Sequence, residues 1–147
     1  MELSAQKKVQ EGINFHKKGK LKKAEVLYRN ALKINPNHPD ANHNLGILLI
    51  SKNKSQDALN FFKVALEANP KMEQFWASYI DTLIRDKQLD KARKLINEGK
   101  ELGFPLENEN LNRIAIEFHK LGRLDDAEIT LRDLIKVKPL LADAHNN

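Results

Sequence analysis

The chain has 147 residues, of which 31% are charged and 6% aromatic, and its formal net charge is +5 at pH 7. It contains no cysteine, which excludes disulfides and Cys-ligated metals and permits a reducing compartment, so we expect a cytoplasmic protein. No apolar run approaches the roughly 18 residues of a transmembrane helix, and the polar start has no signal-peptide pattern, so we expect no membrane insertion.

Apolar residues recur at spacings of three and four along the whole chain, a pattern that predicts amphipathic helices. Turn residues that tolerate a left-handed backbone follow three of them, at Gly19, Asn53 and Gly122. Lys87 stands at the equivalent place in the third pair, where a lysine is strained or the turn differs. The predicted helices span residues 4–18, 21–34, 39–51, 55–68, 73–86, 89–101, 107–121 and 124–137.

One short pattern occurs four times, which indicates an internal repeat. A helical alanine at 24, 58, 92 and 127 is followed four residues later by a large residue, and the spacings between these alanines are 34, 34 and 35. A proline closes each copy, at positions 36, 70, 105 and 139. The sequence 139–147 then copies 36–44, which indicates the truncated start of a fifth copy.

This pattern resembles the tetratricopeptide repeat, a helix–turn–helix unit of about 34 residues. The resemblance implies an all-α fold: a right-handed superhelical array (α-solenoid) of antiparallel helix pairs, with about eight helices and a C-terminal stub. We expect one array over residues 1–147, with units at about 5–38, 39–72, 73–107 and 108–141 and a truncated fifth unit at 142–147. Small residues such as Gly12, Gly46 and Ala115 are expected where paired helices approach closely.

A narrower resemblance concerns the N-terminal repeats of bacterial proteins that carry a glycosyltransferase, sulfotransferase or methyltransferase domain. It rests on Gly19-Lys20-Leu21, Ala24-Glu25, Leu27-Tyr28-Arg29, Leu32, Pro36, His38, Asp40-Ala41 and Leu45-Gly46.

In the family, the first helices of the units line a concave face that holds an extended peptide. Several β-branched residues fall on that stripe, which favours a peptide groove, although some of them can equally be core residues packed against a neighbouring helix. The predicted peptide-binding residues are Val9, Ile13, His16, His43, Asn44, Ile47, Ile50, Ser78, Asp81, Ile84, Asn112, Arg113, Ile116 and His119.

Other chemistry is poorly represented in the sequence. The histidines lack metal-ligand spacing, and no phosphate loop or catalytic set is present, so we expect no catalytic residue, no metal and no cofactor in this segment. The lysines at 17, 18, 20, 22 and 23 lack interleaved aromatics, so we expect solvated helix ends and no nucleic-acid site. Residues 1–36 carry nine basic and three acidic side chains, which can steer an anionic partner to that end.

The sequence therefore predicts a scaffold that binds a protein or an extended peptide. Two alternatives stay open. The segment can be the substrate-recognition arm of a larger enzyme that continues after residue 147, or it can be a self-associating scaffold. In the second case a homo-oligomer forms through the poorly covered face of helix 124–137, which includes Leu134 and Ile135.

Overall fold

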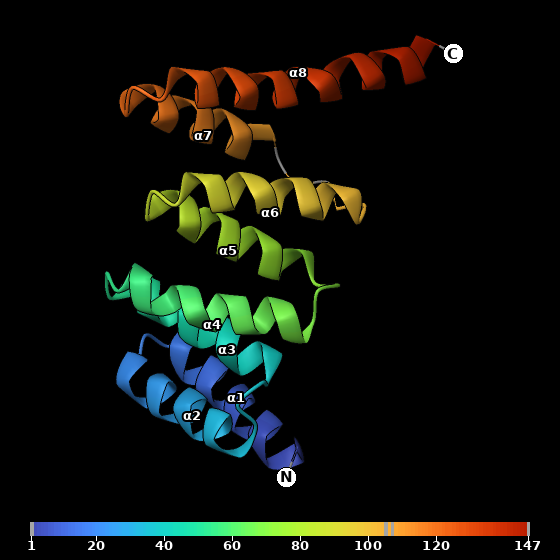
Figure 1. Ribbon diagram of the computed structural model, residues 1–147. Helices are drawn as coiled ribbons and strands as arrows, with labels where there is room; N and C mark the ends of the chain where they lie inside the picture. Colours follow the sequence, from blue (N-terminus) through green and yellow to red (C-terminus); the bar gives the residue numbers. More distant parts are fainter. Residues whose placement is uncertain (1, 105, 107, 147) are drawn as a thin grey trace. The chain divides into compact units, whose positions relative to one another are not determined.

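A computed structural model describes the backbone of residues 2–104, 106 and 108–146, and the side chains of 4–104, 106 and 109–135. These residues form eight α-helices and no strand (Figure 1). Seven of the eight helices match the predicted spans within two residues at each end. The helices are α1 (Glu2–Lys17), α2 (Leu21–Ile34), α3 (Pro39–Ser51), α4 (Ser55–Ala68), α5 (Glu73–Arg85), α6 (Leu89–Glu101), α7 (Asn108–Lys120) and α8 (Leu124–Asn146).

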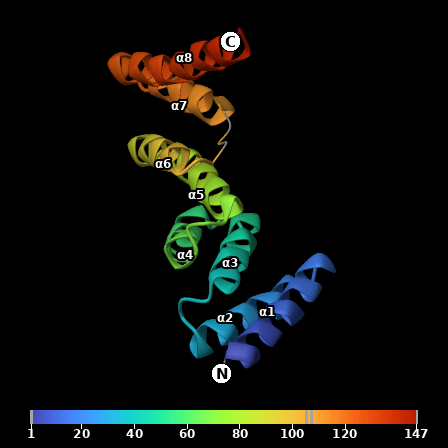
Figure 2. The same cartoon turned by 90° about the vertical axis from the view of Figure 1, so that its right-hand side faces the viewer.

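The chain divides into two compact units, Met1–Thr82 and Leu83–Asn147, and the division falls within α5. In the first unit α1 pairs with α2 and α3 pairs with α4, each as a hairpin of antiparallel helices (Figures 1 and 2). In the second unit α7 pairs with α8 in the same way. The fold is thus an all-α array of helix pairs, as expected. The finer division into repeat units within residues 1–147 stays a prediction.

The same turn joins the two helices of each pair. Gly19, Asn53, Lys87 and Gly122 all have a left-handed backbone, with φ of 76°, 60°, 61° and 76°. One residue further on, a backbone N–H donates to a carbonyl five residues back, for example Lys20 N to Phe15 O at 2.9 Å and Gln88 N to Leu83 O at 2.9 Å. This pairing is the Schellman motif that ends a helix. Lys87 adopts the geometry although it has a Cβ, so the strained alternative foreseen for it is the one observed.

Close approach of paired helices explains the small residues of the first helices. A Cβ added at Gly12 would lie 2.6 Å from the Tyr28 ring, and one added at Gly46 would lie 2.6 Å from the Phe62 ring. Both rings are almost fully buried. The second-helix alanines Ala24 and Ala58 are also fully buried. Aromatic rings therefore lie directly on glycine backbone, which packs each pair tightly.

Side-chain hydrogen bonds hold the junction between one pair and the next. Asn42 Nδ2 donates to Pro36 O at 3.0 Å, and Trp76 Nε1 donates to Pro70 O at 2.8 Å. Asn42 and Trp76 occupy equivalent positions 34 residues apart, so an asparagine amide performs the role of the indole N–H. Each bond fixes the first helix of a unit to the closing proline of the unit before it.

The eighth helix differs from its prediction. The repeat pattern predicts a helix end near residue 137 and a turn at Pro139, but α8 continues through Pro139 to Asn146. The equivalent junction at 35–39 contains two asparagines and a second proline, which favour a turn and a new helix start. Leu140, Leu141 and Ala142 replace those signals with strong helix formers, so local propensity opposes a turn here.

Candidate functional site

Four predicted positions on the first helices, which we call the outward positions, are Ile13, Ile47 and Asp81 in the first unit and Ile116 in the second. They are equivalent residues of the four first helices, with spacings of 34, 34 and 35. Ile47 is 38% exposed and Ile116 is 47% exposed, while Ile13 and Asp81 are partly buried. Three of the four outward positions therefore present isoleucine at least partly to solvent, where a purely solvated helix face would carry polar residues.

Two other predicted site residues, Val9 and Ile84, are buried by neighbouring residues, and their part in a groove stays a prediction. Val9 is fully buried with Ala5, Ala31 and Ala41, because α1 packs there on α2 and α3. Ile84 is 3% exposed. Val9 thus fills a contact between helices, whereas the side chain of Ile84 also lines a cavity of the second unit.

His43 is also buried, at 5% exposure, and its ring packs 4.8 Å from the Phe75 ring and 5.6 Å from the Phe62 ring. Its Nε2 lies 2.8 Å from Ser78 Oγ, so two predicted site residues bind each other across α3 and α5. Burial lowers the pKa of His43, and nearby Asp40 opposes this by a smaller amount. A buried neutral imidazole of this kind joins helices and does not attract an anion.

His16 and Asn44 are half-buried and each has a partner within the fold. His16 Nδ1 lies 3.2 Å from the Tyr28 hydroxyl, and burial lowers the pKa of His16. Burial raises the pKa of Tyr28 to about 12, so its hydroxyl stays protonated. Asn44 Nδ2 donates to Asp40 O at 2.8 Å in its own helix. Of the remaining predicted residues, Ile50 is half-buried, and Asn112 and His119 are exposed.

A cavity of about 340 Å³ in the second unit brings three predicted residues together. Ile84, Arg113 and Ile116 line it from the end of α5 and from α7, together with Arg85, Lys87 and Glu117. The predicted set lacked Arg85, Lys87 and Glu117. Lys87 belongs to the turn after α5, and the repeat pattern marks that position only as a turn. Glu117 follows Ile116 directly but falls on the packing side of the predicted helix.

Charge in this cavity is organised around Glu117. Lys87 Nζ lies 2.7 Å from Glu117 Oε2, and Lys120 Nζ lies 3.5 Å from Glu117 Oε1. The hydrogen bond from Lys87 is the main reason that the pKa of Glu117 is lowered. Arg113 Nη1 donates to Asn110 Oδ1 at 3.1 Å. With three cations and one carboxylate in its lining, the cavity is net positive beside an apolar floor.

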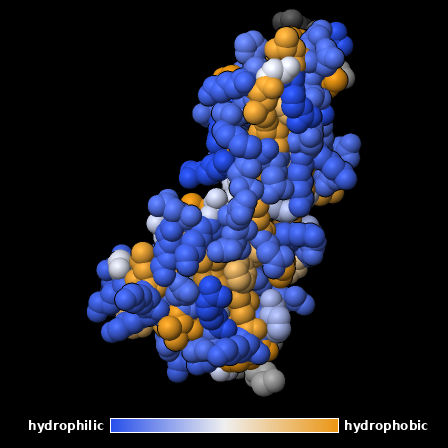
Figure 3. Space-filling model, turned by 60° about the vertical axis from the view of Figure 1, so that its left-hand side comes forward, coloured by the Kyte–Doolittle hydropathy of each residue, from blue (hydrophilic) through white to orange (hydrophobic). Residues whose placement is uncertain are grey.

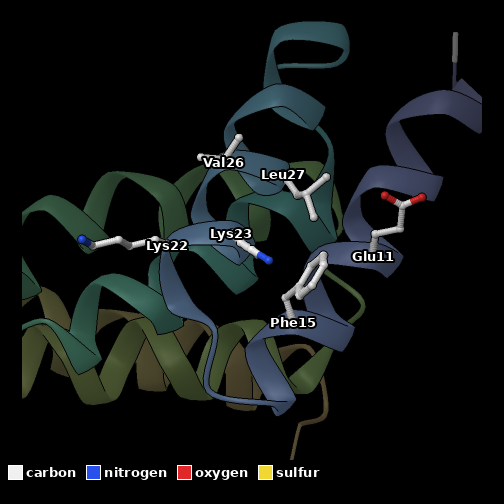
Figure 4. A pocket seen from close by; sticks show the side chains of 6 residues that line it. All are labelled: Glu11, Phe15, Lys22, Lys23, Val26 and Leu27. Atoms are coloured by element: carbon white, nitrogen blue, oxygen red, sulfur yellow. The ribbon is translucent and has the colours of Figure 1, made fainter.

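A second cavity, of about 400 Å³, opens between α1 and α2 (Figure 4). No predicted peptide-binding residue lines it. Lys23 points toward the Phe15 ring, with Nζ 5.4 Å from the ring centroid, whereas Lys22 points away (Figure 4). The face drawn in Figure 3 carries separate apolar patches within a mainly hydrophilic surface. The six residues that line this cavity are Glu11, Phe15, Lys22, Lys23, Val26 and Leu27.

Among the described side chains, no group of three or more His, Asp or Glu residues could hold a metal ion. None of the helices in the described part of the chain combines the length and hydropathy of a bilayer-crossing segment.

Comparison with known families assigns the repeats. A model of the TPR repeat matches residues 12–53, and a model of the tetratricopeptide repeat matches residues 49–103. The chain belongs to the tetratricopeptide-repeat family. As an array of these repeats it is a protein-interaction scaffold.

Known proteins of similar sequence or fold support the architecture. The crystal structure of MamA has a TM-score of 0.73 at 16% identity, over 95% of this chain and 75% of that one. MamA AMB-1 gives 0.72 at 20% identity, over 90% and 72%. MamA 41-end from Desulfovibrio magneticus RS-1 gives 0.67 at 18% identity, over 92% and 76%. These likenesses concern the fold.

One curated relative is far longer than this chain. The cellulose synthase operon protein C of Komagataeibacter xylinus is 23% identical over 125 residues, which are 85% of this chain. The chain spans only 9% of that relative's length.

Proposed function

We propose that the chain binds an extended segment of a partner protein along the outward positions, and that the cavity of the second unit holds an apolar side chain next to an acidic one. The observation that carries this proposal is the lining of that cavity. Ile84 and Ile116 supply apolar surface, and the side chains around them are mostly cationic. Burial of an apolar side chain of the partner in the cavity favours binding, and an adjacent carboxylate is stabilised by charge-assisted hydrogen bonds from the arginines.

The first unit contributes the same kind of contact. Ile13 and Ile47 are the equivalents of Ile116 in the first two repeats, whereas the third repeat has Asp81 at this position. Each site alone is small, and affinity for a segment of this kind comes from several such contacts in series. Two further predictions are not tested by these contacts. One is that the chain is the recognition arm of a larger enzyme, and the other is that this segment has no catalytic activity.

The test starts from random 12-residue peptides displayed on phage and selected on the immobilised chain. We expect selected peptides to place an acidic residue within a few positions of an apolar one. Ile116→Asp should then weaken a selected peptide about tenfold or more, because it puts a charge where the apolar anchor sits. Ile129→Asp is the matched control, since Ile129 is 45% exposed on α8 and lies outside the cavity.

Equal loss of affinity in Ile116→Asp and Ile129→Asp would contradict the proposal, and so would selected peptides without acidic residues. For the first unit, Ile47→Asp combined with Ile50→Asp should abolish binding while the helical circular dichroism and the melting temperature change little. A collapse of melting in that variant would assign both isoleucines to the core.

A further inference from the structure

The cavity between α1 and α2 corresponds to a place that a preceding helix covers in later repeats. In the last repeat, Phe118 is equivalent to Phe15 and Thr130 is equivalent to Leu27. Arg93 of α6 covers both, with Cζ 5.7 Å from the Phe118 ring centroid and Nη1 3.3 Å from Thr130 Oγ1. In the first unit, Arg29 of α2 likewise lies 5.9 Å from the ring of Phe61, another equivalent of Leu27.

At the first repeat, no helix in the described part of the chain covers the equivalent surface. Phe15 and Leu27 line an open cavity there, and Val26 at its edge is 58% exposed. Repeat arrays are stabilised by contacts between successive units, so an uncovered face of this kind has the shape of an incomplete stacking contact.

On α8, two apolar residues are exposed although their equivalents on α2 pack against other residues. Tyr28 is fully buried, but its equivalent on α8, Leu131, is 41% exposed. Leu32 packs against the cluster that includes Ala41 of α3, but its equivalent, Ile135, is 60% exposed. Within the described residues, α8 therefore presents the face that α2 uses to hold the following repeat.

We propose that α8 of one copy of this chain stacks on the cavity between α1 and α2 of a second copy. The charges on the two faces support this occupant. Inside the chain, Glu25 of α2 pairs with Lys52 of the following repeat at 2.7 Å. The equivalents of these residues are Glu128 on α8 and Lys18 after α1, which again carry opposite charges.

A second ion pair inside the chain gives the same result. Arg123 Nη2 lies 3.1 Å from Asp90 Oδ2, and this pair joins the start of α6 to the next repeat. The equivalents are Lys20 and Asp125, also of opposite charge and both exposed. These two ion-pair positions between successive repeats are thus occupied by complementary charges when α8 precedes α1. The third such pair, Lys87 with Glu117, has the uncharged equivalents Gly122 and Asn14 and contributes no charge pair to this contact.

This contact joins two different surfaces of the copies. Each added copy leaves one cavity and one α8 uncovered, so association does not stop at a dimer unless the chain of copies closes on itself. The proposal is independent of the peptide site in the second unit, because it uses none of the residues that line that site.

Sedimentation velocity of the 147-residue chain tests the contact. We expect the mean mass to rise above the 16.9 kDa of one copy as concentration increases from micromolar to millimolar at low salt. At about 1 M salt the Debye length falls to about 3 Å, and the mass should return toward one copy.

Two charge-reversed variants distinguish this contact from any other. Lys18→Glu with Lys20→Glu reverses one surface, and Asp125→Lys with Glu128→Lys reverses the other. Each variant alone then brings like charges together and should associate about tenfold more weakly or not at all. A 1:1 mixture restores opposite charges at both surfaces and should associate again. Lys63→Glu with Lys71→Glu is the control for the lysine variant, because it lowers the net charge by the same amount at exposed sites elsewhere.

Val26→Asp provides a variant that leaves the ion pairs unchanged and should also reduce association, which covers the case in which a charge-reversed chain fails to fold. A wild-type chain that stays at one copy up to millimolar concentration in low salt would overturn the proposal and leave the cavity to a different partner. A mixture of the two reversed variants that stays monomeric while the wild type associates would also overturn it.

Discussion

Single residues set how closely the helices of a pair approach. Gly46 and Gly12 face the rings of Phe62 and Tyr28 at distances that no Cβ tolerates. The flat ring gains dispersion contacts with the backbone, and the cost is a position that accepts no side chain. These glycines are therefore needed for close packing, since both are helical and neither has a positive φ.

We expect Gly46→Ala to destabilise the fold by about 1–3 kcal/mol, because the added methyl must displace the Phe62 ring from a packed core. Alanine favours helix over glycine by about 1 kcal/mol, so a gain in stability would show that the ring moves without cost. Urea denaturation of the variant measures the change. Ile47→Ala, one residue further along α3, is the control at an exposed site.

Lys87 is strained by its place in the repeat. Its φ of 61° puts a Cβ in the left-handed region, which costs about 1–2 kcal/mol for an ordinary residue. We expect Lys87→Gly to raise the free energy of unfolding by up to about 1 kcal/mol, after allowing for the greater freedom of glycine in the unfolded chain.

The loss of the contact between Lys87 and Glu117 accompanies that substitution. Lys87→Gln removes the same charge but keeps a Cβ, so it isolates this effect. Thermal melting of the two variants side by side gives the answer. If Lys87→Gly is no more stable than Lys87→Gln, the left-handed turn stores no strain.

His16 and His43 predict a pH dependence of stability in a defined window. Burial lowers the pKa of both below the ordinary value of 6.5, so the unfolded chain binds their protons more readily than the folded chain. The stability from keeping them neutral is complete above pH 6.5 and is lost as pH falls through the lowered folded pKa values. We expect the urea concentration at the midpoint of unfolding to decrease as the pH is lowered from 7.5 to 5.5.

The His16→Gln, His43→Gln double variant should show a flatter profile across that range. Carboxylates affect the stability of the fold only at lower pH. Hydrogen bonding from Lys52 is the main reason that the pKa of Glu25 lies below its ordinary 4.5, so its contribution is lost only below pH 4.5. A wild-type midpoint that does not change between pH 7.5 and 5.5 would show that the two imidazoles are not held neutral by burial.

At the scale of the helix, α8 shows local propensity acting against the repeat pattern. A proline inside a helix removes one hydrogen bond and costs about 3 kcal/mol relative to alanine. Pro139 lies within α8 as the structure has it, whereas the repeat pattern places it in a turn that closes the fourth unit.

The substitution Pro139→Ala separates these two arrangements. In a continuous helix it restores a backbone donor, so we expect a stronger helical circular dichroism signal and an increase in stability of up to about 3 kcal/mol. In a turn it would leave the signal unchanged or slightly reduced. Pro70→Ala, in the turn after α4, is the reference for a proline in a turn, and its helical signal should stay unchanged or fall slightly.

At the scale of the whole molecule, stability is distributed over contacts between neighbouring repeats. Leu48 of α3 is fully buried within the unit Met1–Thr82. We expect Leu48→Ala to cost about 2–5 kcal/mol. Because repeats depend on their nearest neighbours, the loss should be concentrated in the first unit.

Amide hydrogen exchange maps that loss. Protection should fall most in α1 to α4, while amides from Leu89 onward keep more of theirs. An equal loss in both units would mean that the chain unfolds as one cooperative body. Ile47→Ala, at an exposed neighbour of Leu48, should change exchange little in either unit.

The sequence by itself determined the repeat, its period and nearly all helix ends. These depend on local features: apolar spacing, the residue in each left-handed turn and the closing prolines act within one unit. Gly12 and Gly46 could be assigned to close packing for the same reason, since each faces a residue of its own helix pair.

Only the tertiary structure decided which members of the apolar stripe are accessible. Val9, Ile13 and Ile47 look alike as sequence, yet Val9 is core and Ile47 is open, because burial depends on how the next first helix packs alongside. The partnership of His43 with Ser78 and the cavity beside Ile116 arise in the same way. Such contacts join residues about one repeat apart, and a pattern that is the same in every repeat does not encode which neighbour covers which face.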